Sequence, residues 1–351
     1  MGRPMHESIS GESTRWLASG ILLCLIAAVW LFIGSSSAAK SDKNSEGEQL
    51  LTKADQRFYF RLRGSPPIRI DQTFSVWTRT HGSVQGTDTL IWADVDHWKE
   101  TLKIQDYVET KVGGHESVWS VRNQPIPTLE AWKARELLRS RDYDARLEVA
   151  KVGGIHEIQV GQSIEKCVSV NTKQGGNPNL CFDPINGDLL SSTAKWSDDE
   201  TKSEWSDFID LGAHSIPRHT RKYLNGKLIG QSSITNAAVL ASVDSENFAP
   251  PDGAEEAYSC EHPMPAVPIR ARENESAIAE MYSGTQGTLT IYLKIDDRGN
   301  VATVGVMEAL DPKRDEKAMR TIKSEWKFKP TTCGETSIPS EIEETFTFKS
   351  S

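Results

Sequence analysis

Apolar and polar residues alternate most regularly in the C-terminal part of the chain, from Cys260 to Ser351. Between Gly287 and Ile295 every second residue is apolar, which predicts a strand with one buried face. The polar stretch that follows contains Gly299 and favours a tight reversal, after which residues 301–307 are expected to return as the partner strand. The predicted buried face consists of Leu289, Ile291, Leu293 and Ile295, and the opposite face of Thr288, Thr290, Tyr292 and Lys294.

A helix is predicted after this pair of strands. Asp311 caps free N–H groups and Pro312 suits the first helical position. One face of this helix is expected to lie over the sheet, with the i, i+3, i+4, i+7 spacing of Asp315, Ala318, Met319 and Ile322. Residues 326–330 then alternate as a short basic and aromatic strand, and Ile342 to Phe348 form the last strand. The predicted order is β-β-α-β with a closing strand.

The middle of the chain, residues 55–250, contains a series of short strand patterns separated by glycine, aspartate and asparagine. This spacing predicts a large antiparallel sheet. A helix is expected to interrupt the series at residues 128–139. Asn225-Gly226 predicts a hairpin, because both residues tolerate the positive φ angles of a type I′ turn.

An apolar run extends from Trp16 to Ile33, with Arg3 and Arg15 before it. Its length is sufficient to span a bilayer core of ~30 Å as a single helix with the N-terminus in the cytoplasm. The small residues at 36–39 also fit a cleavage site. Residues 1–39 are therefore either an uncleaved signal anchor in the inner membrane or a cleaved signal peptide of a periplasmic protein. Residues 40–54 are polar and are expected to form a flexible linker.

Composition and charge narrow the function. The chain has 351 residues and a net charge of −9, which disfavours nucleic acid as a partner because such binding needs a basic surface. Of five cysteines, four lie after residue 39 and none forms a C-x-x-C pair, which disfavours zinc or a dithiol redox site. Cys167 and Cys181 flank a Gly-Gly-Asn-Pro turn, so they are either a disulfide or two buried thiols. No catalytic pattern is present, so we expect no enzyme and no cofactor or metal.

Seven of the ten tryptophans lie in the middle region, where they either pack a core or line a concave apolar pocket. The candidate pocket residues are Trp77, Trp92, Trp98, Tyr107, Trp119 and Trp132. Residues 90–100 with Tyr107 and residues 119–123 resemble the LolA-type lipoprotein-localisation fold and its pattern W-x-x-P-D-x-W-R-E. Trp92 to Glu100 keep its spacing, with Val95 and Lys99 in place of proline and arginine. The resemblance implies an incomplete antiparallel barrel covered by helices, with an apolar interior.

Residues 260–351 resemble the TonB C-terminal domain. Its R-x-W-x-F-x-P run is matched at Trp326, Phe328 and Pro330, and Gly299 lies in the preceding turn; Ser324 stands where the arginine would be. Cys260 and Cys333 bracket this region and are expected to form a disulfide. The resemblance implies a peptide partner, the N-terminal box of an outer-membrane TonB-dependent receptor, and inner-membrane proton-motor proteins. The candidate partner-binding strand, if it is an edge strand and not a central one, is Ile342, Glu343, Glu344, Thr345, Phe346, Thr347 and Phe348.

The sequence thus predicts an α+β protein with an N-terminal transmembrane or signal helix, a LolA-like barrel at residues 55–250 and a small TonB-type ββαβ domain at residues 260–351. Two features depart from a TonB energy transducer: the chain lacks a long proline-rich spacer, and the apolar run lacks an ionisable side chain other than the thiol of Cys24. The first functional hypothesis is an envelope protein that docks a receptor peptide or another envelope protein in support of transport across the outer membrane. The second is a periplasmic carrier or sensor of a lipid or acyl chain.

Overall fold

The computed structural model describes residues 37–58, 61, 65–114, 117–139, 149–172, 177–196, 199–258, 260 and 263–349. Residues 43–351 form one compact unit. The predicted anchor or signal peptide at residues 16–33 lies outside the described residues. Within the described part of the chain, no helix is both long enough and apolar enough to cross a membrane.

Helix α1 (Ser37–Phe58) includes the segment that the sequence predicted as a flexible linker at residues 40–54, and that prediction is wrong. Ala54 and Phe58 are buried, and the Phe58 ring meets the Trp205 ring edge-on at 5.8 Å between centroids. The polar composition of the segment hid its few apolar residues, Leu50, Leu51, Ala54 and Phe58, which pack against the large sheet. The helix is ordered by this tertiary packing, which is how most helices in proteins are stabilised.

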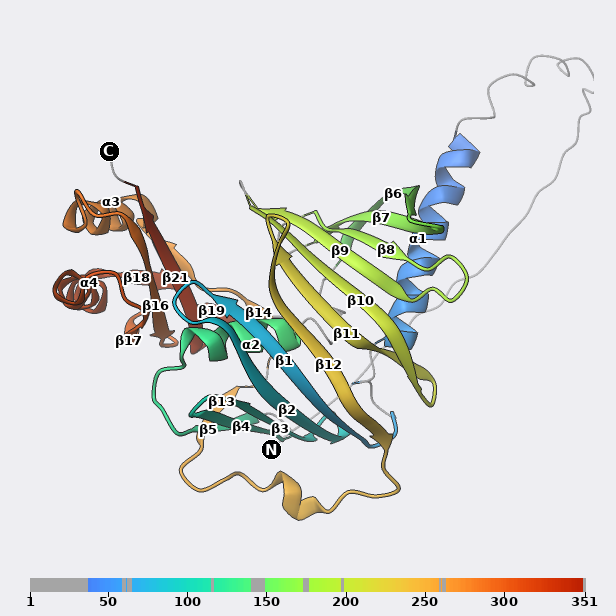
Figure 1. Ribbon diagram of the computed structural model, residues 1–351, viewed down its shortest axis with the longest axis horizontal. Helices are drawn as coiled ribbons and strands as arrows, with labels where there is room; N and C mark the ends of the chain where they lie inside the picture. Colours follow the sequence, from blue (N-terminus) through green and yellow to red (C-terminus); the bar gives the residue numbers. More distant parts are fainter. Residues whose placement is uncertain are drawn as a thin grey trace, which may run out of the picture. The chain divides into compact units, whose positions relative to one another are not determined.

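The large sheet has thirteen antiparallel strands in the order β13-β5-β4-β3-β2-β1-β12-β11-β10-β9-β8-β7-β6 (Figure 1). Two runs of consecutive hairpins meet where β1 pairs with β12. The predicted hairpin at Asn225-Gly226 joins β11 to β12, with φ angles of 50° and 74°. The strands are β1 (Ile68–Thr78), β2 (Gly82–Asp94), β3 (His97–Ile104), β4 (Tyr107–Gly113), β5 (Ser117–Arg122), β6 (Val149–Val160), β7 (Ser163–Thr172), β8 (Asn179–Phe182), β9 (Leu189–Trp196), β10 (Asp199–Leu211), β11 (His214–Leu224), β12 (Lys227–Val239) and β13 (Glu255–Tyr258).

Two helices cover buried side chains of this sheet. Along β1 every second residue from Ile68 to Thr78 is buried, which gives the sheet one interior face. Helix α2 (Leu129–Arg139), which was predicted from sequence, packs Leu137 and Leu138 against residues of β1 to β4, and α1 packs against β7 to β10. The disulfide between Cys167 and Cys181 joins the paired strands β7 and β8. We call residues 43–258 the sheet domain.

The sheet domain extends beyond residue 250. After the 3₁₀ helix η1 (Ser245–Phe248), strand β13 pairs with β5 and forms one edge of the large sheet. Residues 260–349, which follow, we call the C-terminal module. Its elements are β14 (Pro263–Met264), β15 (Val267–Ile269), α3 (Ala271–Met281), β16 (Gly287–Ile295), β17 (Val301–Glu308), α4 (Pro312–Glu325), β18 (Lys327–Lys329), β19 (Thr331–Cys333), β20 (Thr336–Ile338) and β21 (Ser340–Phe348).

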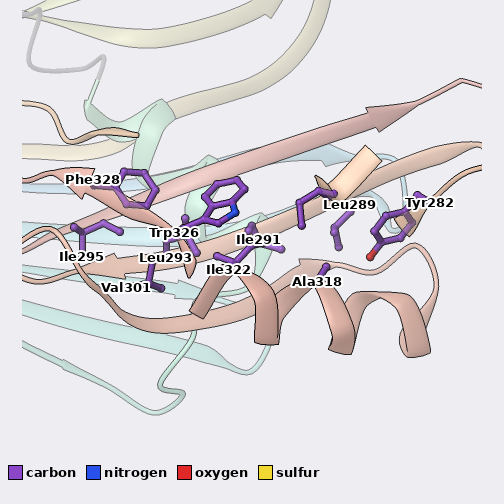
Figure 2. Close-up of a cluster of buried hydrophobic side chains, with 11 residues drawn as sticks. Tyr282, Leu289, Ile291, Leu293, Ile295, Val301, Ala318, Ile322, Trp326 and Phe328 are labelled. Atoms are coloured by element: carbon purple, nitrogen blue, oxygen red, sulfur yellow. The ribbon is translucent and has the colours of Figure 1, made fainter. Parts of the chain in front are cut away.

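The C-terminal module has a single apolar core, drawn in Figure 2. The predicted strand at 287–295 is β16, and its predicted apolar face is fully buried. Helix α4 begins where expected: the Asp311 carboxylate accepts hydrogen bonds from the N–H groups of Lys313 and Arg314. Helix α3 was not predicted, because it contributes only Ile278 and the following Tyr282 to the buried core. The disulfide between Cys260 and Cys333 ties the start of the module to β19.

Candidate partner-binding strand of the C-terminal module

Strand β21 lies at the edge of the three-stranded sheet β17-β16-β21 (Figure 1). It pairs with β16 over its whole length, from Ser340 opposite Ile295 to Phe348 opposite Gly287. Among the described residues, no strand pairs with its other side. An edge strand of this kind presents N–H and C=O groups to which an extended peptide can add.

The opposite edge of the same sheet, β17, is less accessible. Helix α4 packs against β17, and the Lys323 ammonium donates a hydrogen bond of 2.8 Å to the carbonyl oxygen of Val301 and another to that of Ala302. A lysine placed on an edge in this way opposes pairing with a further strand. β21 is therefore the better candidate of the two edges.

The two faces of β21 have different surroundings. Ile342, Phe346 and Phe348 point into the core of the module, where the Phe346 ring lies 5.9 Å from the Trp326 ring and the Phe348 ring stacks on Tyr282 at 4.4 Å. Glu341, Glu343 and Thr345 belong to the other face. This second face lies against the sheet domain, as the contacts of Glu341 show.

Glu341 is held by two arginines of the sheet domain. One carboxylate oxygen pairs with Arg122, and the other lies 3.2 Å from Nη1 of Arg135. Arg135 also donates two hydrogen bonds of 2.6 Å to the Glu109 carboxylate and one of 2.7 Å to the Tyr107 hydroxyl. Burial raises the pKa of Glu341, but the positive charges of Arg122 and Arg135 outweigh it and lower the pKa to about 2.

The same interface extends under the other two strands of the module sheet. The Trp132 ring of α2 meets the Tyr292 ring of β16 edge-on at 6.2 Å, and Ile126 packs against Gly305 of β17. The Arg79 Nε lies 3.3 Å from a Glu308 carboxylate oxygen. Thr290 and Tyr292 are consequently 2% and 1% exposed, although the alternation in sequence predicted one buried face for this strand. The structure corrects that prediction: the polar face is buried by the sheet domain.

Glu343 and Glu344 differ from Glu341 in having no arginine partner. Burial, followed by the nearby Glu136 of α2, raises the pKa of Glu343, although Lys133 and Lys222 oppose the effect. Burial, followed by the negative charges of Glu275 and Glu343, raises the pKa of Glu344. In the described part of the chain, neither carboxylate forms an ion pair. The middle of β21 therefore holds half-buried negative charge beside its unpaired edge.

The residues of the TonB-type motif support the fold of the module. Gly299 has a φ angle of 79°, and a Cβ atom there would lie 1.9 Å from the carbonyl oxygen of Phe328, so only glycine fits. Trp326 and Phe328 are buried in the core, and Pro330 is half-buried. Ser324, at the position of the motif's arginine, donates its hydroxyl to the Arg320 carbonyl on α4.

The six aromatic residues proposed for an apolar pocket do not come together as one group, although Trp92 pairs with Trp98 across two strands and Tyr107 and Trp132 both lie beside Arg135. Tyr107 is buried beneath α2, and Trp92 belongs to another core cluster, against which Trp98 packs. Trp132 faces the C-terminal module, while Trp77 is half-buried on a position of β1 opposite to its buried face. Trp119 is half-buried on β5 beside Gly114.

Sequence reasoning missed the charged residues at this interface, Arg122, Arg135 and Glu109. Arg122 and Arg135 are 219 and 206 positions away from Glu341 in the sequence. Arg122 is the only charged residue between Glu116 and Glu130, whereas α2 contains several charged residues, and in neither segment does a local pattern mark the distant partner. The position of Arg135 among apolar residues on one face of α2 was the sequence feature that could have indicated a buried ion pair.

The C-terminal module is thus a small helix-covered sheet with an unpaired strand at one edge, within an α+β fold. Residues 278–350 match the family described as the Gram-negative bacterial TonB protein C-terminal. This match confirms the resemblance that the Trp326-Phe328-Pro330 pattern indicated. No curated protein sequence matches the chain.

Solved structures similar to this chain include a LolA superfamily protein from Nitrosomonas europaea, with 9% sequence identity and a TM-score of 0.38. The match covers 58% of this chain and 97% of that chain. A DUF1329 family protein from Desulfovibrio piger has 11% identity, coverages of 59% and 97%, and a TM-score of 0.42. The Pseudomonas aeruginosa MucA/MucB complex has 12% identity, coverages of 65% and 69%, and a TM-score of 0.21. Likeness at these TM-scores supports no functional conclusion.

Proposed function

We propose that this protein is a cell-envelope docking protein that binds an extended segment of an outer-membrane TonB-dependent receptor, or of another envelope protein, by strand addition to β21. The unpaired outer edge of β21 carries this proposal, because backbone N–H and C=O groups there are available to a partner strand. The TonB C-terminal match over residues 278–350 supports the choice of partner class. The two disulfides fit an oxidising compartment such as the periplasm.

Strand addition predicts where the affinity originates. A partner strand would pair with β21 through main-chain hydrogen bonds, and its side chains would alternate between the two faces of the sheet. One set would continue the face of Phe346 and Phe348, and the other would continue the face of Glu341 and Glu343.

Peptides corresponding to receptor boxes test the proposal. The full chain, with both disulfides intact, is titrated with each peptide in a calorimeter, and hydrogen exchange is measured with and without peptide. We expect the amides of β21 to gain protection while those of β17 do not. The matched control is the same peptide with N-methyl groups on alternate amides, which removes its hydrogen bonds but keeps its side chains. Equal affinity of the methylated peptide, or protection of another strand, would contradict strand addition.

The alternative function, carriage of a lipid or acyl chain by the sheet domain, has less support. Side chains of α1 and α2 cover two parts of the interior face of the described sheet, and a third part forms a cluster of buried strand residues. A shallow hollow of about 370 Å³ lies over β1, β2 and β12, and hydroxyl and amide side chains form most of its lining. Apolar ligands favour pockets lined mainly by apolar side chains. Lipid analysis of protein purified from membranes would detect a bound acyl chain and revive this alternative.

A further inference from the structure

The sheet domain lies beneath the face of the module sheet that a partner strand would extend. We propose that the partner site is composite: β21 supplies the backbone edge, and α2 and β11 of the sheet domain supply one wall that selects a strand with a basic side chain beside Glu343. This inference rests on the proposed strand addition at β21. It goes further by naming the chemistry of the partner and a second domain that recognises it.

The geometry follows from the order of contacts across the sheet. Ile126 lies under β17, Trp132 under β16 and Arg135 under β21, so the chain from residue 126 into α2 crosses the strands in turn. A further strand would lie ~4.8 Å beyond β21. The charged groups of the sheet domain that act on Glu343 of β21 are Lys133 and Glu136 of α2 and Lys222 of β11, and the last two form a 3.7 Å ion pair. Side chains of the partner on this face would meet them.

Charge decides which partner fits this wall. Glu341 is already neutralised by Arg122 and Arg135. Glu343 has Glu136 as its strongest charged neighbour, which Lys133 and Lys222 oppose from a distance, and it forms an ion pair with no described cation. Glu344, on the other face, faces Glu275. Opposite charges on adjacent strands stabilise their pairing and like charges weaken it. A partner strand with lysine or arginine next to Glu343 is therefore favoured, and one with glutamate there is disfavoured.

The structure provides a variant that disturbs the contact between the two domains without touching β21. Gly305 lies on β17, and a Cβ atom there would lie 2.2 Å from Cδ1 of Ile126 in the sheet domain. Gly305→Val should therefore displace the Ile126 side chain and loosen the domain contact at this point, while valine suits a strand within the module. The matched control is Gly305→Val combined with Ile126→Ala, which restores room for the added side chain.

The experiment uses the full oxidised chain and a peptide set that differs only in one residue. Lysine, glutamine or glutamate is placed in turn at successive positions of a receptor-box peptide. At one position we expect the lysine peptide to bind about five-fold more tightly than the glutamine peptide, which corresponds to one favourable cross-strand pair. Glu343→Gln should abolish this preference. Gly305→Val should weaken binding and reduce the preference, and Ile126→Ala should restore both in the double variant.

Two results would overturn the composite site. One is equal binding of lysine, glutamine and glutamate peptides at every position. The other is unchanged binding and preference in Gly305→Val when hydrogen exchange at residues 123–128 shows that the domain contact has loosened. Failure of the proposed function has a different signature, since then no peptide would bind to the wild-type chain or protect β21.

Discussion

Replacement of Arg135 by methionine is the most informative perturbation of the interface between the two domains. The Arg135 side chain is 7% exposed and that of Glu109 is 3% exposed, and they share two hydrogen bonds of 2.6 Å. Arg135→Met keeps the apolar length of the side chain but removes both short hydrogen bonds from the buried Glu109 carboxylate, which keeps only Lys111 at 3.9 Å and the Ser120 hydroxyl as partners. Loss of one partner of a buried pair costs about 3–5 kcal/mol. We expect the free energy of unfolding to fall by that amount.

The double variant Arg135→Met with Glu109→Met provides the comparison. It removes both charges, and replacement of a whole buried pair by apolar residues is close to neutral. Unfolding in urea, followed by tryptophan fluorescence and by hydrogen exchange of α2, gives the free energies of all variants. The single variant Glu109→Met completes the double-mutant cycle. A loss below about 1 kcal/mol in Arg135→Met, or an equal loss in the double variant, would refute the reasoning that desolvated charge controls this interface.

Four further predictions follow from particular residues. The pKa of Glu341 is lowered to about 2 from an ordinary 4.5, so its ionised form contributes about 3 kcal/mol to the free energy of unfolding. This contribution is complete above pH 4.5 and is lost as the pH falls toward 2. Glu341→Gln should remove this acid dependence in urea titrations. Because the pKa of Glu344 is raised, its ionisation opposes folding as the pH rises, so Glu344→Gln should raise the melting temperature at pH 7 but leave it unchanged at pH 3. Gly299→Ala should lower the free energy of unfolding by more than about 2 kcal/mol, because the new Cβ meets the Phe328 carbonyl. Gly334→Ala, which shares a positive φ angle but has nothing within 4 Å, should lower it by only about 1 kcal/mol. Equal melting temperatures of the two variants would exclude this steric cause. Cys260→Ser with Cys333→Ser removes the disulfide that joins residues 73 positions apart, and should lower the free energy of unfolding by about 4 kcal/mol. Removal of the Cys167–Cys181 disulfide, with a separation of 14, should lower it by about 3 kcal/mol. The reverse order in urea unfolding would contradict the chain-entropy account.

Local sequence was sufficient to define much of the C-terminal module. The alternation at residues 287–295 predicted β16, and Asp311-Pro312 predicted the start of α4. Both depend on interactions within a few residues: a pleat of period two, and a side chain that caps its own helix. The same holds for the hairpin at Asn225-Gly226, where the turn residues impose their own φ angles.

Weak local patterns caused the errors. Residues 40–54 are mostly polar, and only contacts with β7 to β10 show that α1 is a helix with a buried side. Strand β13 has four residues and owes its conformation to pairing with β5, far away in sequence. The sequence left open whether the aromatic residues of the middle region pack a core or line a pocket. Their distribution over separate clusters depends on strand order, which composition does not contain.

The sequence by itself determined the α+β class, the ββαβ order of the module and its likeness to TonB C-terminal domains, because these depend on local periodicity and on short motifs. Only the tertiary structure decided that β21 lies at an edge and that Glu341 on its second face contacts the sheet domain. The physical reason is distance along the chain. The ion pairs that join Glu341 to Arg122 and Arg135 form between residues more than 200 positions apart, and their energy depends on a burial that the fold alone creates.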